Sequence, residues 1–231
     1  STYADYCVVM ARTNPEKGKA GISAFILEKG MPGYTIGKPM NKLGMRASDT
    51  TELFFEDCPV PQANLLGKEG EGYFNALEIL DGGRISIAAM CVGIARGAFE
   101  NAIHYAQERS AFGKKIHQYQ AIKMKLADMA TQIDAARLLV MRSATMKDQG
   151  KDVNLESAMA KVYSSEIALK VADEAIQIYG GYGYIKEYPV EKYYRDAKLG
   201  TIGEGTSEIL RMVIARDLVK RYAIEEKAEL V

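Results

Sequence analysis

The spacing of hydrophobic residues changes about a third of the way along the chain. Up to about residue 66, short runs rich in β-branched and aromatic residues alternate with turn signals such as 14–18 and 30–33. These runs predict four strands, at 6–10, 22–27, 34–36 and 51–55. We expect them to form one small antiparallel sheet that is part of an incomplete barrel or sandwich.

From about residue 71 onward, apolar residues recur at every third or fourth position, which predicts helices. Three long helices are expected at about 71–109, 119–148 and 155–179, followed by a short helix from Pro189 and a last helix after Glu204. Asn154 is expected to cap the third helix, and Gly180 to end it. The first helix is expected to turn these residues inward: Ile85, Ala88, Ala89, Val92, Phe99, Ile103 and Ala106.

The predicted fold class is therefore α+β, with two domains. Residues 1–66 form a partial antiparallel β-domain of the barrel or sandwich type. Residues 67–231 form an up-down four-helix bundle, which the final short helices complete.

Composition excludes several classes of function. Thirty basic residues balance thirty acidic ones, which argues against nucleic acid and anionic membranes as partners. Three widely spaced cysteines predict free thiols, and two histidines without clustered ligands predict no metal site. No apolar run approaches the ~20 residues that a membrane-spanning helix needs, so no membrane insertion is expected. The first residue is serine and no signal peptide is evident, so we expect a processed protein or a piece of a longer one.

One acidic residue stands out as the candidate for chemistry. Glu204 lies between Gly203 and Gly205, directly before a helix that Thr206 can cap. Flanking glycines let a ligand approach the backbone closely, so a carboxylate here can act in a cleft. The alternative is a capping turn in which the acid only complements the helix dipole.

Three further stretches could bind a ligand. Arg109–Lys115 combines cations with Phe112, which suits a phosphate and an aromatic ring, but a solvated basic loop is the alternative. Gly180–Tyr184 could let a dinucleotide approach the backbone, or could simply end a helix. Asp81–Arg84 places paired glycines inside a helix, which costs about 1 kcal/mol each relative to alanine. Either a kink, close helix packing or a bound ligand explains that space.

Together these stretches resemble the acyl-CoA dehydrogenase family, and its short-chain, butyryl-CoA-like members most. The resemblance covers the whole chain. It rests on five motifs in family order: Arg109-x-x-Phe112-Gly113-Lys114, Gln177-Ile178-Tyr179-Gly180-Gly181, Glu187-Tyr188-Pro189-Val190-Glu191-Lys192, Arg195-Asp196-Ala197-Lys198 and Gly203-Glu204-Gly205-Thr206-Ser207-Glu208.

The resemblance implies a reaction and a set of residue roles. Glu204 would be the catalytic base that removes the α-proton of an acyl-CoA thioester, while FAD accepts the β-hydrogen as hydride and a trans-2-enoyl-CoA forms. The implied FAD-binding residues are Arg109, Phe112, Gln120, Gln177, Ile178, Tyr179, Gly180, Gly181, Thr206, Ser207 and Glu208. The implied substrate-binding residues are Asp81, Gly82, Gly83, Arg84 and Gly205.

The resemblance also implies partners and a compartment. Arg109, Phe112, Gln120, Gln177 and Gly181 would bind largely the flavin of a neighbouring subunit, in a homotetramer. Electrons would pass to an electron-transferring flavoprotein, in a bacterial cytoplasm or a mitochondrial matrix. A helical oligomerisation module without activity and an acyl-CoA oxidase are the alternative functions.

Two departures from the family pattern bear on these expectations. Gly203 stands where family members often have a tyrosine, which changes the pocket beside the flavin. The family's N-terminal helical domain and the front half of its β-domain, including a flavin-contacting Trp-Ile-Thr/Ser segment, are expected to precede residue 1.

Overall fold

The structure is a computed structural model that describes residues 2–223. It forms two compact units that meet between Leu80 and Asp81. The domain boundary between residues 66 and 67 stays a prediction.

The first unit contains two small antiparallel sheets. Strand β1 (Tyr6–Arg12) pairs with β2 (Ile22–Glu28) along its whole length, from Tyr6 opposite Glu28 to Arg12 opposite Ile22. The two-residue strand β5 (Leu65–Leu66) pairs with the other edge of β2, and β3 (Tyr34–Ile36) pairs with β4 (Leu53–Phe55). The four predicted strands and their antiparallel pairing are confirmed. The prediction of one sheet is wrong, because β3 and β4 pair with each other and not with β1, β2 or β5.

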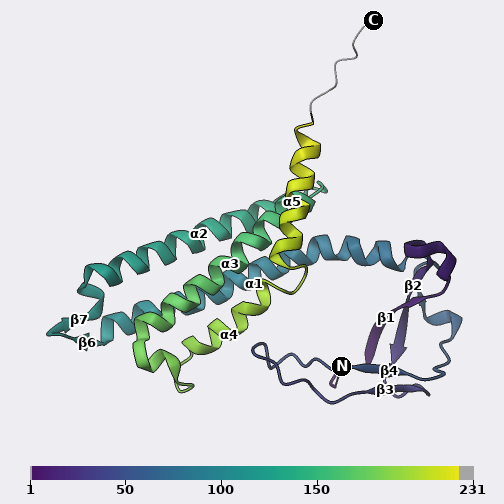
Figure 1. The fold of residues 1–231 in the computed structure, drawn as a ribbon, viewed down its shortest axis with the longest axis horizontal. Helices are drawn as coiled ribbons and strands as arrows, with labels where there is room; N and C mark the ends of the chain where they lie inside the picture. The colour runs from purple at the N-terminus through teal and green to yellow at the C-terminus, as the bar shows by residue number, and fades with distance from the viewer. Residues whose placement is uncertain (1, 224–231) are drawn as a thin grey trace, which may run out of the picture. The chain divides into compact units, whose positions relative to one another are not determined.

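The second unit is helical, as predicted (Figure 1). Helix α1 (Gly72–Glu108) begins in the first unit and continues into the second. The other helices are α2 (Gln120–Asp148), α3 (Asn154–Tyr179), α4 (Val190–Gly200) and α5 (Ser207–Arg221). A hairpin of β6 (Ser110–Ala111) and β7 (Lys114–Lys115) links α1 to α2. The predicted helix limits are thus confirmed to within two residues or so.

Helix α3 is the centre of the bundle. It packs against α2, α4 and α5, and its buried residues share one core with a stripe of small residues on α1. That stripe consists of Ala88, Cys91, Ala95, Ala98, Ala102 and Ala106, each fully buried. Small side chains at a spacing of three or four let two helix backbones approach closely.

The predicted inward face of α1 is therefore only partly right. Ala88 and Ala106 are buried, but Ala89 is exposed and the larger residues Ile85, Val92, Phe99 and Ile103 are only partly buried. The larger side chains flank the contact because alanine and cysteine occupy its middle.

The ends of α3 show one correct and one wrong prediction. Gly180 ends the helix with a positive φ of 61°, as expected of a glycine terminator. Asn154 does not cap the helix, because the cap position is Val153 and the Asn154 side chain bonds to Arg84 and Asp217 instead. The carboxylate of Asp152 accepts the Asn154 backbone N–H at 3.0 Å.

Three negative observations hold for residues 2–223. None of the helices there is long and apolar enough to cross a membrane. No three His, Cys, Asp or Glu side chains in this range lie close enough together to hold a metal ion. Cys7, Cys58 and Cys91 are free thiols.

Candidate active site

Glu204 lies in the tight turn between α4 and α5. Its backbone adopts φ of 54°, a region that residues other than glycine seldom occupy, and Gly205 follows at φ of 91°. The Ser207 backbone N–H donates to the Thr201 carbonyl at 3.1 Å and so closes the turn. The Thr206 hydroxyl accepts the Ile209 N–H at 3.3 Å, which confirms Thr206 as the cap of α5. The turn holds Glu204 in one backbone conformation.

The carboxylate of Glu204 lies against α1 at Gly83. A Cβ atom at Gly83 would lie 2.8 Å from Oε2 and 3.3 Å from Cδ of Glu204, which is closer than such atoms normally approach. The glycine therefore makes room for the acid. The neighbouring Gly82 makes room in the same way for the amino group of Lys147. These two contacts, of Gly83 with Glu204 and of Gly82 with Lys147, account for two consecutive glycines inside a long helix.

The carboxylate also has an unsatisfied acceptor. Oε2 of Glu204 is buried and has no hydrogen-bond partner within the described residues. Buried polar atoms in proteins are nearly always bonded, and an exception calls for an explanation such as a ligand or a catalytic role. A base that must accept a proton from a substrate needs such a free oxygen in a dry place.

A buried lysine supports the same turn. Lys161 lies on α3 with no exposed surface, and its Nζ donates to the carbonyl oxygen of Gly205 at 2.5 Å. Burial lowers the pKa of Lys161 below its ordinary value, while negative charge on Glu204 and Glu208 acts in the opposite direction. Sequence reasoning missed this residue. Its only signal was a single lysine within the apolar stripe of the third helix, next to Val162.

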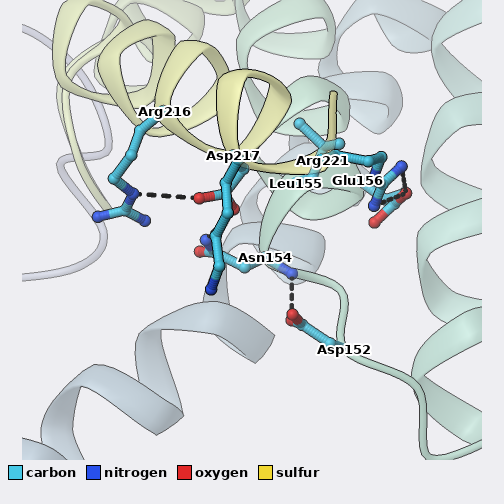
Figure 2. A pocket seen from close by; sticks show the side chains of 8 residues that line it. Asp152, Asn154, Leu155, Glu156, Arg216, Asp217 and Arg221 are labelled. Atoms are coloured by element: carbon cyan, nitrogen blue, oxygen red, sulfur yellow. Dashed lines mark hydrogen bonds and ion pairs between the residues drawn. The ribbon is translucent and has the colours of Figure 1, made fainter. Parts of the chain in front are cut away.

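Arg84 begins a chain of polar contacts that leads from α1 to α5. Its Nη1 donates to Oδ1 of Asn154 at 2.7 Å, and Nδ2 of Asn154 donates to Asp217 at 2.5 Å. Asp217 in turn accepts Nε of Arg216 at 3.1 Å (Figure 2). The predicted substrate residue Arg84 is thus fixed by its neighbours. Asp81 lies on the same helix, but its side chain is outside the described part of the structure.

Asn154, Asp217 and Arg216 line a cavity of about 580 Å³ between the start of α3 and the end of α5 (Figure 2). Its other lining residues are Asp152, Leu155, Glu156, Lys220 and Arg221. Arg221 and Arg142 both bond to Oε1 of the buried Glu156. Sequence reasoning did not identify this cavity, because its charges come from two helices that are far apart in the sequence.

A second cavity, of about 540 Å³, brings together five of the eleven predicted flavin-binding residues. Arg109, Ile178, Tyr179, Gly180 and Gly181 line it. The other lining residues are Tyr105, Ala111, Ile116, Tyr182 and Ile185. Together the lining residues supply aromatic and apolar walls and one cation, Arg109. The guanidinium carbon of Arg109 lies 5.5 Å from the centre of the Tyr182 ring.

Three predicted flavin-binding residues are exposed and do not line this cavity. Phe112 stands at the tip of the β6–β7 hairpin with φ of 49° and 97% of its surface exposed. Gln120 and Gln177 are exposed and do not line the cavity either.

The remaining predicted flavin-binding residues lie elsewhere. Thr206, Ser207 and Glu208 begin α5, whereas the β6–β7 hairpin lies at one end of the bundle, beyond α4 (Figure 1). The hydroxyl of Ser207 is buried and has no partner among the described residues. Backbone hydrogen bonding at the helix start lowers the pKa of Glu208 below its ordinary value. The structure thus divides the predicted flavin-binding residues into two separate groups.

Comparison with known proteins identifies the family. Residues 70–219 match the family model "Acyl-CoA dehydrogenase, C-terminal domain", and residues 1–58 match "Acyl-CoA dehydrogenase, middle domain". The chain belongs to the acyl-CoA dehydrogenase family, and the resemblance noted in the sequence is confirmed.

Individual relatives are close in sequence and structure. The chain is 53% identical to an acryloyl-CoA reductase (NADH) of Anaerotignum propionicum, over 94% of this chain and 55% of the relative. The structure of butyryl-CoA dehydrogenase from Megasphaera elsdenii matches with a TM-score of 0.92 and 47% identity, over 95% of this chain and 57% of that one. A chain in a structure described as the electron transferring flavoprotein of Acidaminococcus fermentans matches with a TM-score of 0.93 and 51% identity, over 95% and 58%. The chain therefore spans a little more than half the length of these relatives.

Proposed function

We propose that the chain belongs to an FAD-dependent enzyme that converts a short-chain acyl-CoA to the trans-2-enoyl-CoA. The observation that carries the proposal is the carboxylate of Glu204, whose buried Oε2 has no partner and lies against Gly83. Family membership and the similarity to a butyryl-CoA dehydrogenase support the substrate class.

Glu204 acts as the general base. Its carboxylate accepts the proton from the α-carbon of the thioester, and the burial of Oε2 keeps water from competing for it. The positive φ of Glu204 and the closed turn around it fix the direction of the carboxylate, so that little reorganisation is needed during the reaction. The glycine at position 83 leaves the opposite wall open to the acid.

The residues present fit an FAD that is bound by two separate groups of residues. Arg109 offers a planar cation for the pyrophosphate, and neither Gly180 nor Gly181 would hinder a close approach, because the space beside both is open. Phe112, Gln120 and Gln177 complete this group from the exposed surface. Thr206, Ser207 and Glu208 form the second group, where the buried Ser207 hydroxyl is unpartnered. When bound, FAD supplies the acceptor for the β-hydrogen.

The separation of the two groups supports a homo-oligomer, and we propose a homotetramer. Arg109 lines the second cavity, whereas Ser207 begins α5 and is not among the residues that line that cavity, so two copies would each contribute one group to a shared cofactor site. We propose that Arg84, which Asn154 holds in place, and Gly205, which Lys161 holds in place, contact the substrate.

The electron partner we propose is an electron-transferring flavoprotein. The relative whose structural description names this protein from Acidaminococcus fermentans supports that choice. The compartment we propose is the cytoplasm of a bacterium or the matrix of a mitochondrion.

The relative named an acryloyl-CoA reductase favours a second candidate function. Reduction of a 2-enoyl-CoA is the same reaction in the opposite direction, in which protonated Glu204 would return the proton to the α-carbon. Both directions use the same geometry, so the direction depends on the electron partner.

An anaerobic titration of the full-length flavoprotein tests the proposal. Butyryl-, isobutyryl-, isovaleryl- and octanoyl-CoA are added in turn while the flavin absorbance is recorded, and butyryl-CoA is expected to bleach it most completely. Rapid reoxidation of the bleached flavin by air would instead indicate an acyl-CoA oxidase. No bleaching by any of the four would indicate a helical module without this activity.

A further inference from the structure

A lysine is buried in the middle of the bundle, where the only hydrogen bond of its side chain among the described residues is to a backbone carbonyl. Lys161 on α3 has no exposed surface, and a lysine is almost never fully buried unless it is paired. Among the described side chains, no carboxylate forms an ion pair with Lys161. An apolar residue of the same length would fill the space at a lower desolvation cost. Packing alone therefore does not account for a lysine here.

The hydrogen bond of Lys161 leads to the turn that carries the proposed base. Its Nζ donates to the carbonyl oxygen of Gly205, the residue directly after Glu204, at 2.5 Å. Both residues of this turn have positive φ, at 54° and 91°, a conformation that persists only where the surroundings impose it. The Lys161 bond ties the turn to the most buried helix of the molecule.

The charged and titratable groups around Lys161 come from three elements. Helix α1 contributes Arg84 and Cys91, the turn contributes Glu204, and α5 contributes Glu208. The Cys91 thiol is itself buried, which raises its pKa to about 11, so it is uncharged at neutral pH. The negative charges that face the lysine are therefore those of Glu204 and Glu208.

We propose that Lys161 is a positioning residue for Glu204. It holds the 204–205 turn through the Gly205 carbonyl, and so fixes the place from which the Glu204 carboxylate reaches the substrate. This inference rests on the proposed role of Glu204 as the base.

Three substitutions separate the hydrogen bond from the charge. Lys161→Met removes both, Lys161→Gln can keep a donor without a charge, and Lys161→Arg keeps the charge. Lys170→Met, which removes an exposed lysine from the same helix, is the matched control. Each variant is made in the full-length holoenzyme, and the rate of flavin reduction is followed by stopped flow over a range of butyryl-CoA concentrations.

Lys161→Met is expected to slow flavin reduction by about tenfold, since a displacement of a fraction of an ångström costs about that much. The loss should appear in the limiting rate and not in the butyryl-CoA concentration that gives half of that rate, because the turn positions the base and does not bind the substrate. Lys161→Gln, which can keep a donor to the Gly205 carbonyl, should lose less rate than Lys161→Met, and Lys161→Arg should recover part of the loss.

Two readouts do not depend on activity. Thermal midpoint and FAD content should be retained or raised in Lys161→Met, because an apolar residue replaces a buried charge. Amide hydrogen exchange in the segment 199–209 should become faster in Lys161→Met and stay unchanged in Lys170→Met.

The outcomes that overturn the inference are distinct from failure of the proposed function. If the wild-type flavin is bleached and Lys161→Met has the same limiting rate, Lys161 has no positioning role. A loss of rate that neither Lys161→Gln nor Lys161→Arg restores would show only a packing role and would overturn the inference. If Lys161→Met does not fold, a wild-type limiting rate and wild-type amide exchange at 199–209 in Lys161→Gln overturn the inference. If no acyl-CoA bleaches the wild-type flavin, the proposed function fails first.

Discussion

Replacing Gly83 by alanine tests the contact between α1 and the proposed base. The new Cβ would lie 2.8 Å from Oε2 of Glu204, and ordinary carbon contacts begin at about 3.5 Å. Helix α1 is fixed by its buried stripe of small residues, whereas the carboxylate is the far end of a flexible side chain. The carboxylate is therefore the part that moves, by roughly half an ångström or more.

The size of the effect follows from this displacement. A misplacement of about 1 Å can cost on the order of 100-fold in rate, so half of that distance should cost about tenfold. The stability of the helix should change in the opposite direction, because alanine is favoured over glycine in a helix interior by about 1 kcal/mol. Gly83→Ala should thus make the protein slower but no less stable.

Gly93→Ala is the matched control. Gly93 lies on the same helix, and a Cβ there would meet no atom within 4 Å. Both variants are measured in the full-length flavoprotein, by stopped-flow flavin reduction with butyryl-CoA and by thermal unfolding. Gly93→Ala is expected to gain stability and keep the wild-type rate. The reasoning is refuted if Gly83→Ala also reduces its flavin within twofold of the wild-type rate.

Three other predictions concern the cofactor and the alternative place for a base. Arg109→Ala should weaken FAD retention and oligomer stability together, because Arg109 lines a cavity that a second subunit is proposed to complete. Gel filtration with flavin quantitation measures both, and full FAD occupancy in an intact oligomer would contradict this role. The chain 1–231 alone should be helical by circular dichroism but hold FAD poorly, and stoichiometric FAD after gel filtration would contradict that expectation. The double variant Gly83→Glu with Glu204→Gly should reduce its flavin measurably faster than the single variant Glu204→Gly, because the two positions face each other. If the double variant still binds FAD and acyl-CoA but is as inactive as the single one, Gly83 does not face the α-carbon.

The helical part of the fold was largely predictable because its signals are local. The apolar period, the terminating Gly180 and the capping Thr206 each depend on neighbours within a few residues. The inward face of α1 was harder to predict, because a stripe of alanines has little contrast in hydrophobicity with the rest of the helix. The division of the strands between two sheets was not predictable either, because it depends on pairings between distant residues.

The candidate site shows the same division between local and distant signals. Glycines on both sides singled out Glu204, and the paired glycines of α1 indicated a need for space, which the Glu204 carboxylate and Lys147 occupy. The signal of Lys161, a lysine within an apolar stripe, was too weak to use, because a lysine in a helix is usually on the solvent face. Asn154 looked like a helix cap because it directly precedes an apolar helical segment. Its side chain instead bonds to Arg84 and Asp217, which are distant in the sequence.

The most direct test of the central claim is the rate of flavin reduction in Glu204→Gln. Glutamine keeps the size of the side chain but cannot take a proton from the substrate, so the full-length variant should keep its FAD and bind butyryl-CoA. Glu187→Gln, which changes an exposed acid outside the site, serves as the control and should behave like the wild type. The account predicts that butyryl-CoA reduces the flavin of Glu204→Gln at least ~100-fold more slowly than that of the wild type. A rate within twofold of the wild type, at full FAD occupancy, would show that Glu204 is not the base.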